Sequence, residues 1–270
     1  MSIKDFNSTN GKTYSLYNGE VKLNFKESGH QYEVNGKEVV GVTTVLRTVI
    51  AKEALVNWAV KMTANYILEN WKPDRKFTLE EIGKIVENAK KQHRLEKEKA
   101  GTLGSDVHEW IKNYIKAKIT KLPIPPLPEN KDYLIPINAF LKWEREGNII
   151  FKESERVVYS KKYGYAGTLD FTALVNNNLM LGDIKTSNYI YPESYFLQLA
   201  AYRYALEEEN SQAKIKGMFI LRVPKTKDSQ LEIMIVNNYE ENAKAFLYGL
   251  GLYRQITKLK NFYNKGGEKQ

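Results

Sequence analysis

The segment from Tyr165 to Ser187, YAGTLDFTALVNNNLMLGDIKTS, restricts the fold more than any other part of the sequence. Its pattern indicates two β-strands joined by an asparagine turn, because asparagine tolerates the left-handed backbone of tight hairpin turns. Each strand carries one aspartate, Asp170 in the first and Asp183 in the second. A strand that covers a core normally alternates apolar and polar residues. These two acids therefore either face solvent or meet each other around a metal ion.

The register of this hairpin decides how close the two aspartates lie. A two-residue turn at 176–177 would place Asp170 directly opposite Asp183. A three-residue turn would place Asp170 opposite Ile184 and leave Asp183 as a near neighbour. Directly opposed Cβ atoms lie ~5 Å apart, and two carboxylates at that distance repel each other unless a cation or a shared proton intervenes.

Lys185 follows Asp183 by two residues and shares its strand face. Two carboxylates and an ammonium group would then converge on one spot, which suits a hard divalent cation such as Mg²⁺. Lys185 would orient an attacking water or offset the charge that develops on a phosphate oxygen. The alternative is a solvated hairpin with two surface acids and an ion pair between Asp183 and Lys185.

Four further polar side chains lie on other predicted elements. His108, at the edge of a buried helical stripe, is either a packing and hydrogen-bonding residue or a metal ligand. Gln198 and Tyr202 are four residues apart and share one face of a predicted helix. A buried glutamine needs a partner, which is either a loop backbone or the proposed site. Glu155, on the preceding strand, is either an outer ligand or a solvent-facing acid.

The overall charge favours a polyanionic partner. The formal net charge is +9 and the sequence pI is about 9.3, which indicates nucleic acid first and acidic membranes second, although a lysine-rich genome would give the same excess. Four cations near predicted strand ends are candidate phosphate contacts: Lys161, Lys162, Arg222 and Lys225.

The chain has no cysteine, which excludes disulfides, thiolate zinc sites and iron–sulfur clusters. No apolar run approaches the ~20 residues of a membrane span, so we expect a cytoplasmic protein.

The order of predicted elements indicates a mixed α/β (or α+β) fold with a central mixed sheet flanked by helices. A hairpin turns at Asn35-Gly36, and helices follow over 43–71, from 78 to about 101, from Thr102 onwards and over 137–147. Strands dominate from 150 to 186, a helix covers 192–210, two strands follow, and a helix spans 239–264. We expect residues 1–99 to form an N-terminal hairpin and helices on the core, 100–262 the core, and 263–270 a flexible tail.

The motifs GYAGTLDFTAL, LGDIKTS and QLAAY together resemble the PD-(D/E)XK nucleases. The similarity is greatest to the RecB-like exonuclease branch, which includes phage-type and mitochondrial-genome-maintenance-type members. That branch has a histidine-bearing helix, a G-x-x-D strand, a D/E-x-K strand and a Q-x-x-x-Y helix. The matching positions here are His108, Gly167, Asp170, Asp183, Lys185, Gln198 and Tyr202. The resemblance covers roughly residues 100 to 225, and its four elements occur in the expected order.

The resemblance implies a restriction-endonuclease-like core with a helical N-terminal extension. The groups it implies as holders of one or two Mg²⁺ or Mn²⁺ ions are His108, Asp170, Asp183 and the backbone carbonyl of Ile184. Lys185 would position the attacking water, and Gln198 and Tyr202 would organise the site from their helix. Some relatives carry a four-cysteine iron–sulfur cluster, which this chain cannot form.

The expected function is therefore metal-dependent hydrolysis of phosphodiester bonds by a DNA exonuclease, acting on ends of single-stranded or duplex DNA. One alternative is a structure-specific or weakly specific endonuclease that uses the same site. Another is a non-catalytic nucleic-acid-binding protein. A recombination or replication protein is a candidate partner, and the sequence does not indicate an oligomeric state.

Overall fold

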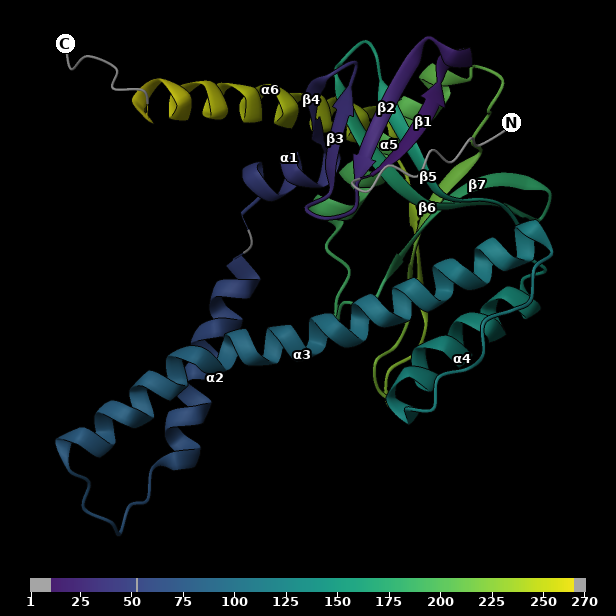
Figure 1. The fold of residues 1–270 in the computed structure, drawn as a ribbon. Coiled ribbons are helices and arrows are strands. Elements are labelled where there is room, and N and C mark those ends of the chain that lie inside the picture. Colours follow the sequence, from purple (N-terminus) through teal and green to yellow (C-terminus); the bar gives the residue numbers. More distant parts are fainter. Residues whose placement is uncertain (1–10, 52, 265–270) are drawn as a thin grey trace. The chain divides into compact units, whose positions relative to one another are not determined.

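The computed structural model describes residues 11–51 and 53–264, except for the side chains of residues 53–55, 93, 97, 99 and 100. Nine strands form one mixed sheet with helices around it (Figure 1). This confirms the predicted fold class. Contacts divide the chain into a first unit, of residues up to 50 and from 108 onwards, and a second unit of residues 51–107. The predicted boundaries at residues 99 and 262 stay predictions. Residues 265–270, most of the predicted tail, lie outside the described part.

All nine strands belong to the first unit. They are β1 (Lys12–Leu16), β2 (Val21–Lys26), β3 (Gln31–Val34), β4 (Lys37–Gly41), β5 (Ile150–Ser160), β6 (Tyr165–Val175), β7 (Asn178–Lys185), β8 (Gly217–Arg222) and β9 (Glu232–Val236). The helices are α1 (Val42–Val49), α2 (Glu53–Asn70), α3 (Leu79–Thr120), α4 (Lys131–Glu146), α5 (Pro192–Glu209) and α6 (Tyr239–Asn264), and η1 (Tyr17–Gly19) is a short 3₁₀ turn.

Two antiparallel meanders meet at β6. Strands β1 to β4 pair in chain order, with the predicted hairpin turn at Asn35-Gly36, where both residues have positive φ. Strands β5, β6 and β7 form the second antiparallel set. Strand β8 then pairs parallel to β7 after the α5 crossover, and β9 returns antiparallel to β8. A parallel neighbour requires such a crossover, because a tight turn can join only antiparallel strands.

One edge of β6 is shared by two different partners. Its first residues, Tyr165 and Ala166, pair parallel with β4, whereas its last residues, from Phe171 onwards, pair with β7. The backbone from Gly167 to Asp170 lies between these two ladders on that edge, while β5 pairs along the opposite edge. The sheet therefore branches at the position of the first predicted acid.

The asparagine turn has the tighter of the two predicted registers. Asn176 and Asn177 have φ values of 49° and 60°, and Val175 pairs with Asn178. Two successive residues with positive φ form the type I′ turn, whose twist matches that of the flanking strands. The two-residue turn, and with it the closer approach of the two aspartates, is confirmed.

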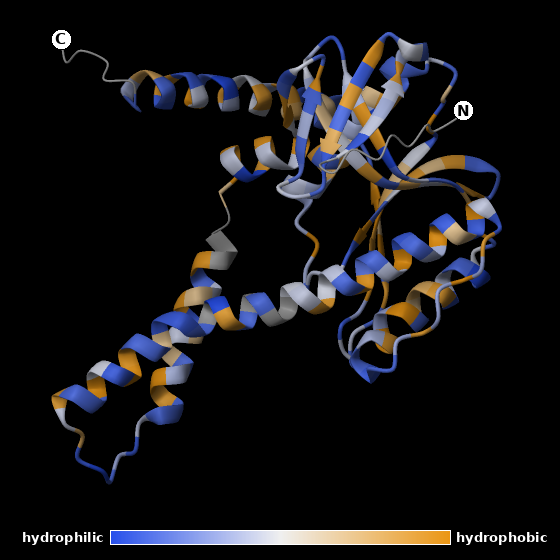
Figure 2. Ribbon diagram, in the orientation of Figure 1, coloured by the Kyte–Doolittle hydropathy of each residue, from blue (hydrophilic) through white to orange (hydrophobic). Residues whose placement is uncertain are grey.

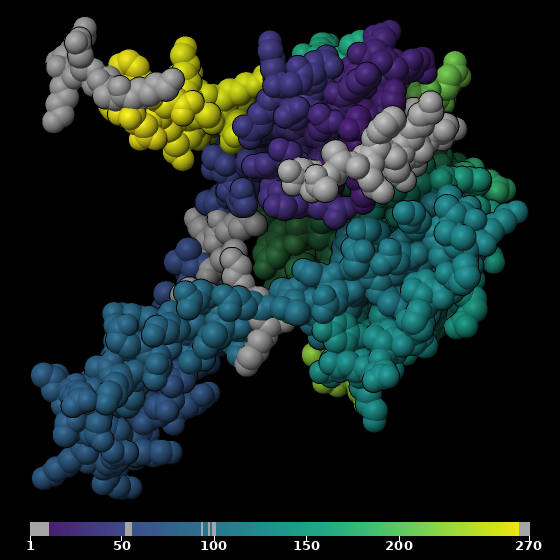
Figure 3. Space-filling view, viewed as in Figure 1, coloured from purple at the N-terminus to yellow at the C-terminus, as the bar shows by residue number. Residues whose placement is uncertain are grey.

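Helices of the first unit pack on the sheet through two groups of apolar side chains. Helices α1, α5 and α6 share a core with the strands, including Leu46, Leu199 and Phe246. Helix α4 packs by aromatic contacts, in which the ring centroids of Phe140 and Phe151 lie 6.1 Å apart. Figure 2 shows the apolar stretches of the strands and of α4 in orange. Figure 3 shows α6, in yellow, beside the N-terminal strands, in purple.

Helix α3 differs from the prediction because it is continuous. A new helix was expected near Thr102, but α3 runs from Leu79 to Thr120. Gly101 and Gly104 lie within it. Interior glycines each cost about 1 kcal/mol relative to alanine, but they keep the backbone N–H that proline lacks, so they weaken a helix without ending it.

Helix α4 begins six residues earlier than predicted. The sequence predicted this helix over 137–147, but it begins at Lys131 and contains Pro136. The side chain of Asn130 accepts a hydrogen bond from the N–H of Asp132, at 2.9 Å, and so caps the helix. Pro136 lies beyond the first turn, so the helix lacks the hydrogen bond that an N–H at this position would donate to the carbonyl of Asp132.

The second unit contains α2 and the beginning of α3. A capping box lies at the start of α3: the N–H of Thr78 donates to Oε2 of Glu81 at 2.9 Å, and the N–H of Glu81 donates to Oγ1 of Thr78 at 3.2 Å. This reciprocal pair satisfies two backbone donors that a helix start otherwise leaves free.

Among the described residues, none of the helices is both long and apolar enough to span a bilayer.

Candidate active site

Three carboxylates lie side by side on neighbouring strands at the branch of the sheet. Asp170 of β6 precedes Phe171, which pairs with Gly182, so the hairpin ladder brings Asp170 across from Asp183 of β7. On the other side of β6, Ser154 pairs with Phe171 and Arg156 with Leu169, which puts Glu155 across from Asp170. We call Glu155, Asp170 and Asp183 the acid row. Neighbouring strands are ~4.8 Å apart, so these carboxylates repel one another strongly unless positive charge compensates.

Asp170, at the centre of the row, receives two hydrogen-bonding contacts on one oxygen. Its Oδ2 lies 3.1 Å from Nε2 of His108 and accepts the N–H of Ile184 at 2.7 Å. Burial opposes the charge of this carboxylate, but His108, Lys185 and the N–H of Ile184 together outweigh it and hold the pKa of Asp170 below its usual value. The contact with Asp170 raises the pKa of His108 to about 9. Asp170 is therefore the member of the row that ionises most readily.

Asp183 is buried between a cation and an amide. Its side chain is 1% exposed, and its Oδ2 lies 2.6 Å from Nζ of Lys185. Oδ1 accepts a hydrogen bond from Nε2 of Gln198 at 3.3 Å. Burial raises the pKa of Asp183 to about 6, because Lys185 offsets only part of the desolvation and Asp170 adds repulsion. Within the described part of the chain, Oδ2 accepts no hydrogen bond of good geometry, so its contact with Lys185 is ionic.

Glu155 has an unusual backbone. Its φ is 52° in the middle of β5, in a region that non-glycine residues rarely occupy. Such strained positions concentrate at functional sites. Burial raises the pKa of Glu155 to about 7, and repulsion from Asp170 adds to the effect. One ligand atom from each of His108, Glu155 and Asp170 lies within 4.8 Å of the other two.

Helix α5 supports the row from its polar face. Nε2 of Gln198 donates to the hydroxyl of Tyr202 at 3.1 Å as well as to Asp183. The ring of Tyr202 lies directly on the backbone of β6, where a Cβ on Gly167 would come within 2.3 Å of the ring. Only glycine fits under this ring. Burial raises the pKa of Tyr202, so its hydroxyl stays protonated.

The donor set fits a hard divalent cation. Carboxylate oxygens and an imidazole suit Mg²⁺ or Mn²⁺, and the poorly satisfied Oδ2 of Asp183 is a further oxygen beside them. Burial, with added repulsion from Asp170, raises the pKa values of Glu155 and Asp183, and a bound cation would offset both causes. His108 must lose its proton before it can bind a metal ion.

The residues predicted from the sequence converge on one place. The contacts described above join His108, Asp170, Asp183, Lys185, Gln198 and Tyr202. Asp183 contacts Lys185 and Gln198. It is not a member of the group of potential metal ligands formed by His108, Glu155 and Asp170. The peptide of Ile184 contacts Asp170 through its N–H, and the role of its carbonyl as a ligand stays a prediction.

The four candidate phosphate contacts are dispersed. Lys161 forms an ion pair with Glu20 at 2.7 Å, and Nζ of Lys162 lies 5.2 Å from the ring centroid of Tyr163. Both lie in the β5–β6 turn. Arg222 pairs with Lys185 in the β7–β8 ladder and binds Glu232 at 2.8 Å. Lys225 is partly buried, which lowers its pKa. Their role in DNA binding stays a prediction.

The sequence left two interpretations of Glu155 open, an outer ligand or a solvent-facing acid, and Glu155 was not predicted as a site residue. Pairing of Ser160 with Tyr165 leaves a four-residue turn closed by Gly164, whose φ is 60°. Counting back along both strands from that turn puts Glu155 opposite Asp170. The glycine in SKKYGY was the signal that could have identified Glu155.

No family model matches the chain, and no curated protein matches it either. Among solved structures, the chain is similar to a candidate exonuclease from Eubacterium rectale, at 13% identity and a TM-score of 0.39, over 62% of this chain and 69% of that one. It is also similar to an alkaline exonuclease from Laribacter hongkongensis, at 16% identity and a TM-score of 0.30, over 58% of this chain and 84% of that one. Similarity at this level leaves the function to be argued from the chain's own residues.

Proposed function

We propose that this protein is a metal-dependent deoxyribonuclease of the PD-(D/E)XK type, in its RecB-like branch, and that it degrades DNA from ends. The observation that carries the proposal is the acid row with Lys185 at its end. Three neighbouring carboxylates are costly to bury without a compensating cation. Perturbed pKa values of this kind concentrate at catalytic sites.

His108, Glu155 and Asp170 would hold a divalent cation, with Asp183 as a further oxygen donor. Such an ion would supply Lewis-acid polarisation of a phosphate and a lower pKa for water. Since His108 and Glu155 are protonated below pH values of about 9 and 7, respectively, in the protein without metal, binding would release protons. Metal affinity would therefore increase with pH.

Lys185 would act on the phosphate oxygens. Its side chain is 18% exposed and its ammonium lies 2.6 Å from Asp183. Burial opposes its charge, but Asp183 and Asp170 raise the pKa of Lys185, so it stays protonated at neutral pH. A fixed ammonium group can stabilise the charge that grows on phosphate oxygens and can orient a water for attack.

Gln198 and Tyr202 would act as positioning residues. Gln198 fixes Oδ1 of Asp183 and so leaves Oδ2 directed at Lys185. Tyr202 holds Gln198 and is itself fixed by contact with Gly167. Pre-organised side chains of this kind reduce the reorganisation that a reaction requires.

DNA as the substrate rests on the charge of the chain and on the motif resemblance. A net charge of +9 favours binding to a polyanion through its phosphates. The preference for ends follows from the branch of nucleases that the motifs resemble, in which exonucleases predominate.

The test uses end-labelled linear DNA and covalently closed circular DNA, each single- and double-stranded, with Mg²⁺, with Mn²⁺ or with EDTA. We expect metal-dependent loss of linear DNA and survival of circles. Lys185→Ala should reduce the rate by about 10²–10³-fold, the range for removing one electrostatic donor. Lys142→Ala, which removes an exposed lysine from α4, is the matched control and should leave the rate unchanged.

Two results would count against the proposal. Cleavage of circles would indicate an endonuclease that uses the same site. Full activity in both Asp183→Ala and Lys185→Ala would overturn the site assignment, provided that melting curves show both variants to be folded.

A further inference from the structure

A short loop of neutral residues joins the end of β7 to α5. Residues 186–191, TSNYIY, contain no charged side chain and two tyrosines. Tyr189 is 70% exposed. The ring centroid of Tyr191 lies 5.8 Å from that of Tyr195, in an edge-to-face contact. The ring of Tyr189 is therefore accessible to a partner molecule, four residues after Lys185.

The loop is linked to the catalytic lysine by a chain of specific contacts. Nζ of Lys185 lies 4.8 Å from the ring centroid of Tyr195. The hydroxyl of Tyr195 donates to Oγ of Ser187 at 3.2 Å. Oγ of Ser187 donates in turn to the carbonyl of Tyr189 at 2.6 Å. The backbone of Tyr189 is therefore held in a fixed relation to the ammonium group of Lys185.

Lys185 and Tyr189 are close enough along the chain for one substrate strand to reach both side chains. Tyr189 follows Lys185 by four residues, which span at most ~14 Å. A nucleic-acid strand advances ~3.4 Å per nucleotide in a duplex. A base within a few nucleotides of a phosphate held at Lys185 is thus within reach of Tyr189.

We propose that residues 186–191 form a stacking platform for unpaired bases, with Tyr189 as its exposed ring and Tyr191 beside it. The occupant is a single strand, because the face of a base is free to stack on a side chain only when its neighbours do not cover it. Neutral aromatic residues beside a phosphate-binding site are the recurring solution for such strands. This inference rests on the proposed function and specifies the form of its substrate.

The test measures equilibrium binding of two fluorescent oligonucleotides by anisotropy. One is a twelve-nucleotide single strand of thymidines, and the other has the same phosphates but abasic positions throughout. Ca²⁺ replaces Mg²⁺ because it takes the same oxygen ligands, and a gel verifies that the oligonucleotides remain intact. The proteins are the wild type, Tyr189→Ala, Tyr189→Trp and, as a matched control, Tyr248→Ala, since Tyr248 is an equally exposed tyrosine (78%) on α6.

The wild type should prefer the strand with bases by on the order of tenfold, the effect of stacking on one aromatic ring. Tyr189→Ala should lose most of this preference while its affinity for the abasic strand stays the same. Tyr189→Trp should retain the preference, and so should Tyr248→Ala. Equal preference in the wild type and in Tyr189→Ala would overturn the platform, as would a tenfold loss of affinity for both strands.

Failure of the platform and failure of the proposed nuclease are distinguishable. If the wild type degrades linear DNA but Tyr189→Ala keeps the preference for bases, only the platform is wrong. If the wild type shows no metal-dependent hydrolysis, the nuclease is wrong, whatever the binding ratio.

Discussion

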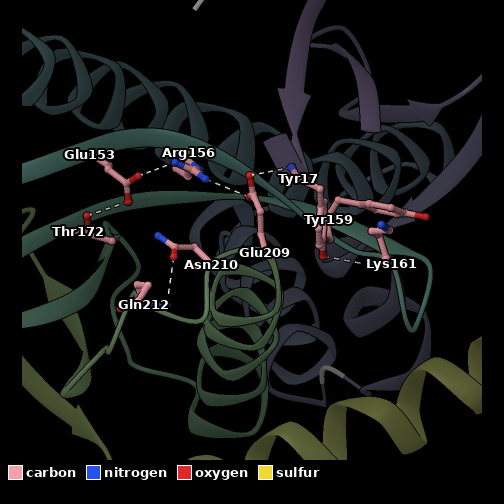
Figure 4. A network of polar contacts seen from close by, with 9 residues as sticks. All are labelled: Tyr17, Glu153, Arg156, Tyr159, Lys161, Thr172, Glu209, Asn210 and Gln212. Atoms are coloured by element: carbon pink, nitrogen blue, oxygen red, sulfur yellow. Dashed lines mark hydrogen bonds and ion pairs between the residues drawn. The ribbon is translucent and has the colours of Figure 1, made fainter. Parts of the chain in front are cut away.

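Glu153 and Glu155 lie two residues apart on β5 but belong to two charged clusters with different chemistry. Glu153 belongs to what we call the ionic cluster, Glu153, Arg156 and Glu209 (Figure 4). The guanidinium of Arg156 lies 2.7 Å from Glu153 and 3.0 Å from Glu209. Thr172 donates a hydrogen bond to Glu153, and the N–H of Tyr17 donates one to Glu209. Each carboxylate therefore has both a cation and a second donor.

Glu155, in the acid row, has no such contact between its carboxylate and a cation or a second donor among the described residues. The largest electrostatic influence on Glu155 is repulsion from Asp170, which, together with burial, raises its pKa to about 7. Asp183 has a cation in contact, and burial nevertheless raises its pKa to about 6. A cluster with excess negative charge is unfavourable for folding but favourable for binding a cation.

The two clusters are therefore expected to have different roles, stability of the fold for the ionic cluster and cation binding for the acid row. The ionic cluster joins β5 to α5 and to the N-terminal turn η1, so its satisfied charges stabilise the fold. In the acid row, the raised pKa values of Glu155 and Asp183 mean that ionising these two carboxyls opposes folding when no metal ion is bound. Removing charge should therefore have opposite effects in the two clusters.

The largest expected effect follows from Arg156→Ala in the ionic cluster. This change leaves Glu209 unpaired, with a side chain that is only 4% exposed. Breaking a buried ion pair by removing one partner typically destabilises a protein by about 3–5 kcal/mol. We expect a loss in the free energy of unfolding within that range, measured by urea denaturation.

The matched control for Arg156→Ala is Lys161→Ala. Lys161 and Glu20 also form an ion pair, but their side chains are 43% and 69% exposed. Exposed pairs contribute about 0–1 kcal/mol, so this variant should remain close to the wild type. Equal effects of the two changes would show that the ionic cluster is no more important for stability than a surface pair.

Part of the acid row could be predicted from the sequence, since local rules determine the hairpin that carries Asp170 and Asp183. The two asparagines select a type I′ turn, and that turn fixes the register that brings Asp170 across from Asp183. Residue spacing on α5 then predicts that Gln198 and Tyr202 share a face. These inferences needed only neighbours in the chain.

Long-range pairing is what the sequence could not provide. The parallel contact of β4 with the start of β6 joins residues more than a hundred positions apart, and no local pattern encodes it. The left-handed backbone at Glu155 also depends on its surroundings, because a glutamate has no intrinsic preference for it. The continuity of α3 through two glycines was missed for a related reason, since helix propensity yields to context.

A smaller effect should follow from Gly167→Ala, which disturbs the acid row and leaves the ionic cluster intact. The added Cβ would lie 2.3 Å from the Tyr202 ring, so the ring must move and displace its hydrogen bond to Gln198. Over-packing of this kind costs about 1–3 kcal/mol. We expect a stability loss in that range, measured by thermal melting, together with a fall in nuclease rate below the melting temperature.

Gly251→Ala is the control for this substitution. A Cβ there would meet nothing within 4 Å among the described atoms, and the residue lies inside α6. Replacing an unstrained helical glycine with alanine stabilises by about 0.5–1 kcal/mol, so the two changes should have opposite signs. A neutral Gly167→Ala variant with normal activity would mean that the Tyr202 ring does not hold the site.

The smallest expected effect, and the one with a reversed sign, is that of Glu155→Gln. A carboxyl whose pKa is raised on folding contributes stability below its unfolded value, near 4.5, and loses it as the pH rises through the folded value, near 7. Glutamine does not titrate. The difference in the free energy of unfolding between the variant and the wild type should therefore shift in favour of the variant as the pH rises from 4 to 8. After discounting for solvent screening, we expect a gain on the order of 1 kcal/mol, measured by urea denaturation at several pH values in EDTA.

Metal should reverse the order of stability for this pair. An ion that binds only the folded state stabilises it according to its affinity, and Glu155→Gln removes one of the proposed ligands. With millimolar Mn²⁺ at pH 8, the wild type should therefore gain more in melting temperature than the variant. Asp183→Asn is the corresponding test for the other buried acid, since burial raises the pKa of Asp183 to about 6; it too should gain less melting temperature from Mn²⁺ than the wild type. An equal gain for the wild type and Glu155→Gln would exclude Glu155 as a ligand and leave the metal to His108, Asp170 and Asp183.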